Sequence, residues 1–233
     1  MISNSIRLLP VMLLVLSLLT VFSPAAHAGP PLLCHPFEIG KAASLPWAGP
    51  EWKGMKASYD INRLVNDTTA LLASQTPVLV RMETLRRAAI YAVWKSESKD
   101  GGDLRVAREL LAQLEARANE AKGKGQPEAL ALFDLGYLVE TYRQALRPDD
   151  LSIIKGIDGY TAVARAITMR VHDPEMEFAA AVVAEWPKRP TQMDHLRRSV
   201  NEAKDGTLLA KNLTSHFADM GTSIADLRNR LAQ

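Results

Sequence analysis

Residues 127–148 read PEALALFDLGYLVETYRQALRP, and this segment decides the fold class of the chain. Pro127 stands in the first turn, where a helix favours proline, and Arg147-Pro148 end the segment. Apolar residues between these points occupy nearly every face of the helix, and a helix of this kind is usually surrounded by other helices. The segment therefore predicts a central helix that carries two polar side chains into apolar surroundings, Asp134 and Glu140.

The segments on both sides of this helix also have helical spacing of their apolar residues. Expected helix starts near residues 77, 103, 127, 149 and 173 are about 24 residues apart, which fits antiparallel helices joined by short turns. Asp173-Pro174-Glu175 combines a cap, a first-turn proline and a first-turn acid. No segment alternates as a strand does. We predict an all-α fold, an antiparallel helical array or bundle of about seven to eight helices.

Two later segments carry more specific predictions. Gly156 and Gly159 predict a break or bend near residues 155–159. A heptad pattern near the C-terminus predicts one helix from about Thr207 to Leu231, with its seam packed inside the domain or forming a dimer. We expect internal packing. The seam consists of Ala210, Leu213, Phe217, Met220, Ile224, Leu227 and Leu231.

The first residues have the order of a secretory signal peptide. Arg7 precedes an apolar run from Val11 to Leu19, and Ala26-His27-Ala28 is a small-residue cleavage site. The run is too short for a membrane span of roughly 20 residues. We predict a signal peptide over residues 1–28, export to the periplasm or the extracellular space, and no stable membrane insertion after cleavage.

Residues 29–56 differ in composition from the rest of the chain. Five prolines favour extended backbone there, because proline restricts both itself and the preceding residue. The apolar side chains of this segment are costly to leave in water. They are Leu32, Leu33, Phe37, Ile39, Leu45, Trp47 and Trp52. We predict an extended Pro-rich N-terminal arm that lies on a single helical domain, residues 57–233.

The composition and charge argue against a nucleic-acid partner. The chain is 47% hydrophobic and 23% charged, with a formal net charge of +2, and these values are typical of a globular protein. A nucleic-acid partner would need a concentrated basic face, so we predict no nucleic-acid binding. Arg81, Arg86 and Arg87 are interpreted as the solvent-facing side of a helix, where Arg87 can pair with Glu83 four residues earlier.

The sequence offers few groups for chemistry. It has no Glu-x-x-His pair, no Gly-x-Ser-x-Gly turn and no phosphate-binding glycine loop, so we predict no metal site and no cofactor. His172, His195 and His216 are interpreted as surface or capping groups. The remaining catalytic candidates are Cys34, His35 and Asp134. A buried aspartate commonly has an arginine partner, and a lone cysteine is commonly buried.

Two motifs carry a resemblance. The first is Cys34-His35-Pro36-Phe37 with Ile39-Gly40 and Ser44-Leu45-Pro46-Trp47, and the second runs from Arg81 to Ala89. Together they resemble a group of exported bacterial helical proteins with no assigned function. The resemblance would cover much of the chain after the signal peptide, and it implies no activity, cofactor or catalytic residue.

Three hypotheses for function follow. The leading one is an exported, non-catalytic helical protein that binds another macromolecule or self-associates as a homo-oligomer. The second is a thiol- or metal-dependent activity centred on Cys34 and His35, with Asp134 as a further member. The third is a small-molecule carrier with a pocket between helices. An exposed apolar seam would favour the first hypothesis. Convergence of Cys34 or His35 with Asp134 would favour the second, and a large apolar groove would favour the third.

Overall fold

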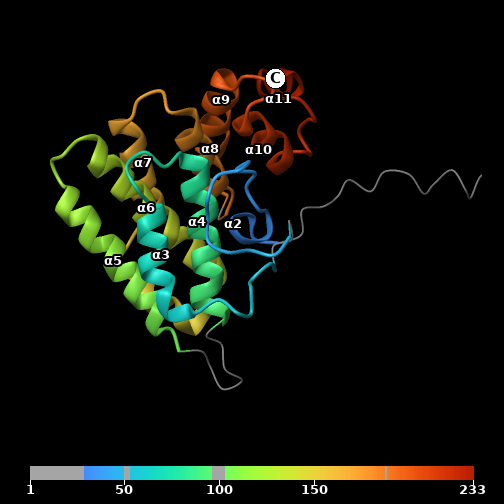
Figure 1. The fold of residues 1–233 in the computed structure, drawn as a ribbon. Coiled ribbons are helices and arrows are strands. Elements are labelled where there is room, and N and C mark those ends of the chain that lie inside the picture. Colours follow the sequence, from blue (N-terminus) through green and yellow to red (C-terminus); the bar gives the residue numbers. More distant parts are fainter. Residues whose placement is uncertain (1–28, 50–52, 96–102, 187) are drawn as a thin grey trace, which may run out of the picture.

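The fold is all-α, as predicted (Figure 1). A computed structural model describes residues 29–49, 53–95, 103–186 and 188–233. Within these ranges the chain forms helices and turns, and the only strand-like pairing is an antiparallel bridge between Trp47 and Met55. The predicted signal peptide, residues 1–28, lies outside the described ranges, as do Pro50 and Trp52 of the arm.

The helices follow one another with short connections. They are α2 (Pro31–Cys34), α3 (Leu64–Leu71), α4 (Val78–Ile90), α5 (Arg105–Ala121), α6 (Gln126–Ala145), α7 (Gly159–Met169), α8 (Pro174–Glu185), α9 (Gln192–Glu202), α10 (Leu208–His216) and α11 (Ile224–Leu231). Two 3₁₀ segments (Ile61–Arg63 and Pro148–Ile154) and a π-helical turn (Tyr91–Lys95) complete the described elements. The described α-helices are more numerous and shorter than predicted, because the arm contains α2 and the C-terminal segment forms two helices.

Helix α6 is the central element that its sequence predicts. It packs against α4, α5 and α7, and the side chains of Asp134 and Glu140 are each 2% exposed. Helix α7 approaches α6 closely because both contribute a glycine at the crossing. A Cβ added to Gly136 would lie 2.4 Å from the carbonyl oxygen of Gly159, so only glycine allows this spacing.

The predicted helix boundaries near residues 155–173 are confirmed. The chain leaves its 3₁₀ segment at Ile154 and starts α7 at Gly159, where the side chain of Asp158 accepts the amide N–H of Thr161. Asp173 caps α8 by accepting the amide N–H groups of Glu175 and Met176, with Pro174 in the first turn. These caps set where α7 and α8 begin.

The interpretation of the α4 arginines as solvent-facing is wrong. Arg81 is 1% exposed and Arg86 is 0% exposed. Helix α4 is covered by α3, α6, α8 and the arm, so it has no solvent side over most of its length. Glu83, also fully buried, accepts Nε of Arg86 at 2.7 Å and Nε of Arg87 at 2.6 Å.

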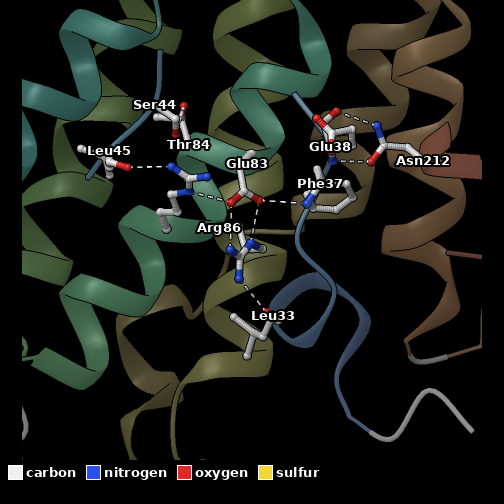
Figure 2. A network of polar contacts seen from close by, with 10 residues as sticks. Leu33, Phe37, Glu38, Ser44, Leu45, Glu83, Thr84, Arg86 and Asn212 are labelled. Atoms are coloured by element: carbon white, nitrogen blue, oxygen red, sulfur yellow. Dashed lines mark hydrogen bonds and ion pairs between the residues drawn. The ribbon is translucent and has the colours of Figure 1, made fainter. Parts of the chain in front are cut away.

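The same charged cluster holds the backbone of the arm (Figure 2). Glu83 accepts the amide N–H of Phe37 at 3.0 Å. Arg86 donates to the carbonyl of Leu33 at 2.9 Å, and Arg87 donates to the carbonyl of Leu45 at 2.7 Å. Three points of the arm, twelve residues apart from first to last, are therefore fixed by side chains of one helical turn.

The arm places apolar side chains in the core at and beside these points. Leu32 and Leu45 are 0% exposed and Phe37 is 3% exposed. Phe37 stacks on His216 of α10 with ring centroids 4.6 Å apart, and Asn212 of α10 bonds to both backbone groups of Glu38. Figure 1 shows this blue segment lying between α4 and α10. The arm thus joins the C-terminal helices to the central bundle.

The prediction of one C-terminal helix is wrong. Residues 217–223 separate α10 from α11, and Gly221 lies in this turn, where an added Cβ would come within 2.5 Å of the Cβ of Asp226. The heptad spacing fits the sequence but the two parts belong to different helices. Most of the seam is buried within the chain, against α8 and α9, with Ile224 at 2% and Leu227 at 0% exposure.

We predict that Ile224→Asp lowers the free energy of unfolding by about 3 kcal/mol or more, because it places a carboxylate among apolar side chains. Ala225→Asp is the matched control, since Ala225 is exposed in the same helical turn. Denaturant unfolding measures the stability, and analytical ultracentrifugation measures the mass. An Ile224→Asp protein of normal stability whose mass is half that of the wild type would contradict internal packing.

Candidate functional site

Cys34 and His35 lie at the end of α2. Cys34 is half-buried, and burial raises the pKa of its thiol, although the charges of Arg86 and Lys53 act in the opposite direction. A raised pKa lowers the thiolate fraction at neutral pH, and the thiolate is the reactive form. The ring of His35 faces that of His216, with centroids 5.7 Å apart.

Asp134 lies in another part of the core. Nη1 of Arg81 donates to its Oδ2 at 2.6 Å, so an arginine is the partner of this buried carboxylate. Burial raises the pKa of Asp134 to about 6, while the charges of Arg81 and Arg117 oppose the shift. The contacts of Asp134 and those of His35 thus involve different residues, and no single centre is built from the three predicted candidates.

A polar cluster that the sequence analysis missed lies between α7, α8 and α9. Glu177 of α8 accepts Nε of Arg198 at 2.7 Å and faces Nδ1 of His195 at 2.6 Å. Burial alone would raise the pKa of Glu177, but the hydrogen bonds from His195 and Arg198 outweigh it and lower the pKa. The interpretation of His195 as a surface or capping group is wrong, because it is only 6% exposed.

The hydrogen bonds fix the orientation of the imidazole. Nδ1 donates to the carboxylate of Glu177, and Nε2 shares a hydrogen bond of 2.9 Å with the hydroxyl of Tyr160. Nη2 of Arg198 also lies 2.8 Å from Nδ1, but an Nδ1 that carries the proton for Glu177 cannot accept a second one. The hydrogen bond from Nε to Glu177 therefore orients the guanidinium of Arg198, and Nη2 only lies against His195.

An apolar cleft of about 420 Å³ opens beside this cluster. We call it the Arg198 cleft. Its lining residues are Ile167, Thr168, Val171, His172, Pro174, Glu177, Arg198, Asn201 and Glu202. Clefts of roughly 300–1,000 Å³ with mainly apolar walls and a few convergent polar groups are the usual form of small-molecule sites. The Arg198 cleft has these properties.

The rim of the cleft carries two unusual residues. Val171 is 70% exposed, and His172 has a backbone φ of +66°, a conformation that L-residues rarely adopt. Strained backbone and exposed apolar surface both cost free energy, and both tend to occur where a ligand binds. His172 itself is exposed, as the sequence analysis expected.

The sequence holds only a partial signal for this site. His195 and Arg198 are three residues apart and share a face of α9, which helical spacing predicts. Glu177 lies on another helix, 18 residues before His195, and no periodicity relates the two positions. His216 was also misread as a surface or capping group: it is 9% exposed because Phe37 of the arm stacks on it.

Further observations bound the chemistry of the described residues. No group of three or more His, Cys, Asp or Glu side chains within them is placed to hold a metal ion. No helix in the same ranges is long and apolar enough to cross a membrane.

The chain matches no protein-family model, no curated protein and no solved structure. The resemblance to exported bacterial proteins therefore stays a prediction.

We predict that Asp134 makes stability depend on pH. Its carboxyl has a pKa of about 6 in the fold, above the ordinary value of 3.8, so the folded state binds a proton more readily. The stabilisation is complete below the ordinary value and is lost as pH rises through about 6. Relative to that of Asp134→Asn, the free energy of unfolding of the wild type should rise by about 1 kcal/mol when the pH falls from 7 to 5.

Urea unfolding of both proteins at the two pH values measures this difference, and subtraction of the Asp134→Asn values removes the titration of other groups. A difference that stays constant, or moves in favour of Asp134→Asn at low pH, would contradict the raised pKa.

Proposed function

We propose that this protein is an exported carrier that binds a small, largely apolar molecule bearing one anionic group in the Arg198 cleft. The observation that supports this most is a guanidinium fixed beside apolar walls with part of its donor set unused. Export is itself part of the proposal, and it rests on the sequence of residues 1–28. The reasons concern the geometry of Arg198, the walls of the cleft and the local charges.

Arg198 is held in one orientation before any ligand arrives. Its Nε donates to Glu177, and its Nη2 lies against His195. Among the described residues no hydrogen bond uses its Nη1, and its side chain is 51% exposed. A guanidinium presents two parallel N–H groups to a carboxylate, phosphate or sulfonate, and less entropy is lost when its plane is already fixed.

The walls of the cleft suit the apolar part of such a ligand. Ile167, Val171 and Pro174 supply apolar surface, and the buried methylene groups of a ligand would each contribute about 0.8 kcal/mol. The volume matches small molecules rather than a folded partner. The C-terminal seam, which was the sequence argument for self-association, is mostly buried within the chain. Binding of a macromolecule stays a prediction.

The charges near the cleft indicate that an anion would be recognised by direct contacts rather than by long-range attraction. Arg198 neutralises Glu177, while Glu202 adds one negative charge at the rim. Long-range attraction therefore does not draw an anion to this cleft, and the direct hydrogen bonds from Arg198 must supply the preference. Removal of the Glu202 charge should strengthen the binding of an anion, because one repulsive interaction disappears.

We predict that anilinonaphthalene sulfonate binds at least about tenfold more tightly than the neutral probe N-phenylnaphthylamine, which has the same rings without the sulfonate. Arg198→Gln should abolish this preference. Arg197→Gln is the matched control, because Arg197 is the exposed neighbour on the same helix and pairs with Asp194 outside the cleft. Fluorescence titration measures the binding of both probes to the wild type and to the two variants.

Glu202→Gln adds a test of the sign, since it should tighten sulfonate binding and leave the neutral probe unchanged. Equal binding of the two probes to the wild type would contradict the proposal. So would a sulfonate preference that survives Arg198→Gln, because the anion would then be bound elsewhere.

A further inference from the structure

A second cavity, unconnected with the Arg198 cleft in its lining residues, lies between α3, α4, α5 and α6. It has a volume of about 220 Å³, and Asp134 and Arg81 line its buried part. We call it the Asp134 cavity. Arg117, Glu120 and Lys124 also line it, and Glu120 and Lys124 are exposed, so they mark its rim.

Asp134 has an oxygen without a hydrogen bond. Its Oδ2 accepts Nη1 of Arg81, but its Oδ1 is buried and has no partner among the described residues. The residue is only 2% exposed. An unsatisfied buried carboxylate oxygen costs free energy, and such atoms are rare in folded proteins. A donor from outside the described residues would satisfy this oxygen.

The neighbouring arginines are already occupied in a way that keeps them in place. Nε of Arg81 donates to the carbonyl of Thr76, and its Nη2 donates to that of Ala73. Arg117 donates to the carbonyls of Thr69 and Leu72. These carbonyls belong to the end of α3 and the turn after it, where helical partners are missing. In this arrangement neither guanidinium donates to Oδ1.

The charges of the cavity favour a monoanion. Arg81, Arg117 and Lys124 contribute three positive charges, and Asp134 and Glu120 contribute two negative charges, which leaves one positive charge in excess. An ammonium group would be repelled by the arginines, so the donor that Oδ1 lacks is best supplied by a neutral hydroxyl. The remaining walls include Leu72, Leu130 and Ala131, which are apolar.

We propose that the Asp134 cavity binds a small hydroxycarboxylate, whose hydroxyl donates to Oδ1 of Asp134 and whose carboxylate meets Arg117 and Lys124. Water is the other possible donor to Oδ1, and the cavity is far larger than the roughly 10–15 Å³ that one water needs. This site does not depend on the Arg198 cleft, so the failure of one proposal leaves the other standing.

Three probes with one carbon skeleton test the proposal. 2-Hydroxyisovalerate carries a hydroxyl beside its carboxylate. Isovalerate lacks this hydroxyl, and L-valine has an ammonium in place of the hydroxyl. Calorimetric titration of the whole protein at neutral pH should show binding of hydroxyisovalerate at least about tenfold tighter than that of either analogue. Asp134→Asn should remove this selectivity, because the charge that accepts the hydroxyl is lost.

A second pair of variants tests the site without touching the ion pair. Ala131→Leu adds bulk inside the cavity and should abolish binding, whereas Ala116→Leu makes the same change on the exposed face of α5 and should have no effect. If no probe binds at millimolar concentration, the cavity holds water only and the proposal is wrong. Equal binding of the three probes, or binding that survives Ala131→Leu, would also overturn it.

Discussion

The buried carboxylate of Glu83 is the interaction on which the rest of the structure depends. It accepts four hydrogen bonds, three from Arg86 and Arg87 and one from the amide of Phe37. Removing three charges from water costs several kcal/mol per ion, and only complete hydrogen bonding offsets that cost. The two arginines use further donors on carbonyls of the arm, and both lie over the ring of Trp47. The arm is thus required by the cluster as much as the cluster is required by the arm.

The clusters around Glu83, Asp134 and Glu177 differ in how many of their polar atoms have hydrogen-bond partners. The Glu83 carboxylate has a donor on each oxygen, and its role is structural. At the second cluster one oxygen of Asp134 has no partner beside a cavity. At the third, Nη1 of Arg198 has no hydrogen bond among the described residues and adjoins an apolar cleft. The last two clusters, which have polar atoms without hydrogen bonds among the described residues, are the ones for which we propose binding.

The sequence predicts what depends on local rules and fails where distant contacts decide. Apolar spacing, Pro127 and the Asp173 cap are local signals, and they locate α6 and α8 correctly. Glu–Arg pairs three or four residues apart have the same spacing on a solvent-exposed helix face as in a core, so the burial of Arg86 could not be predicted from the sequence of α4 alone. Arg86 is covered by the arm, where the carbonyl of Leu33, 53 residues earlier, accepts its hydrogen bond. The heptad pattern of the C-terminus likewise fits one long helix or two that share a core. Of the residues in the two proposed binding sites, the sequence analysis named Asp134, as a catalytic candidate. Its oxygen without a partner and the pairing of Glu177 with Arg198 arise only when separate helices meet.

The most direct test of this account is hydrogen exchange at the amide of Phe37 in the wild type and in Glu83→Gln. The variant keeps the size of the side chain but removes the charge that holds two arginines and the arm. We expect slow exchange at Phe37 in the wild type, and in the variant we expect exchange at least about tenfold faster across residues 33–45 while the amides of α5 stay protected. Unchanged protection of Phe37 in a folded Glu83→Gln protein would contradict the central role of Glu83.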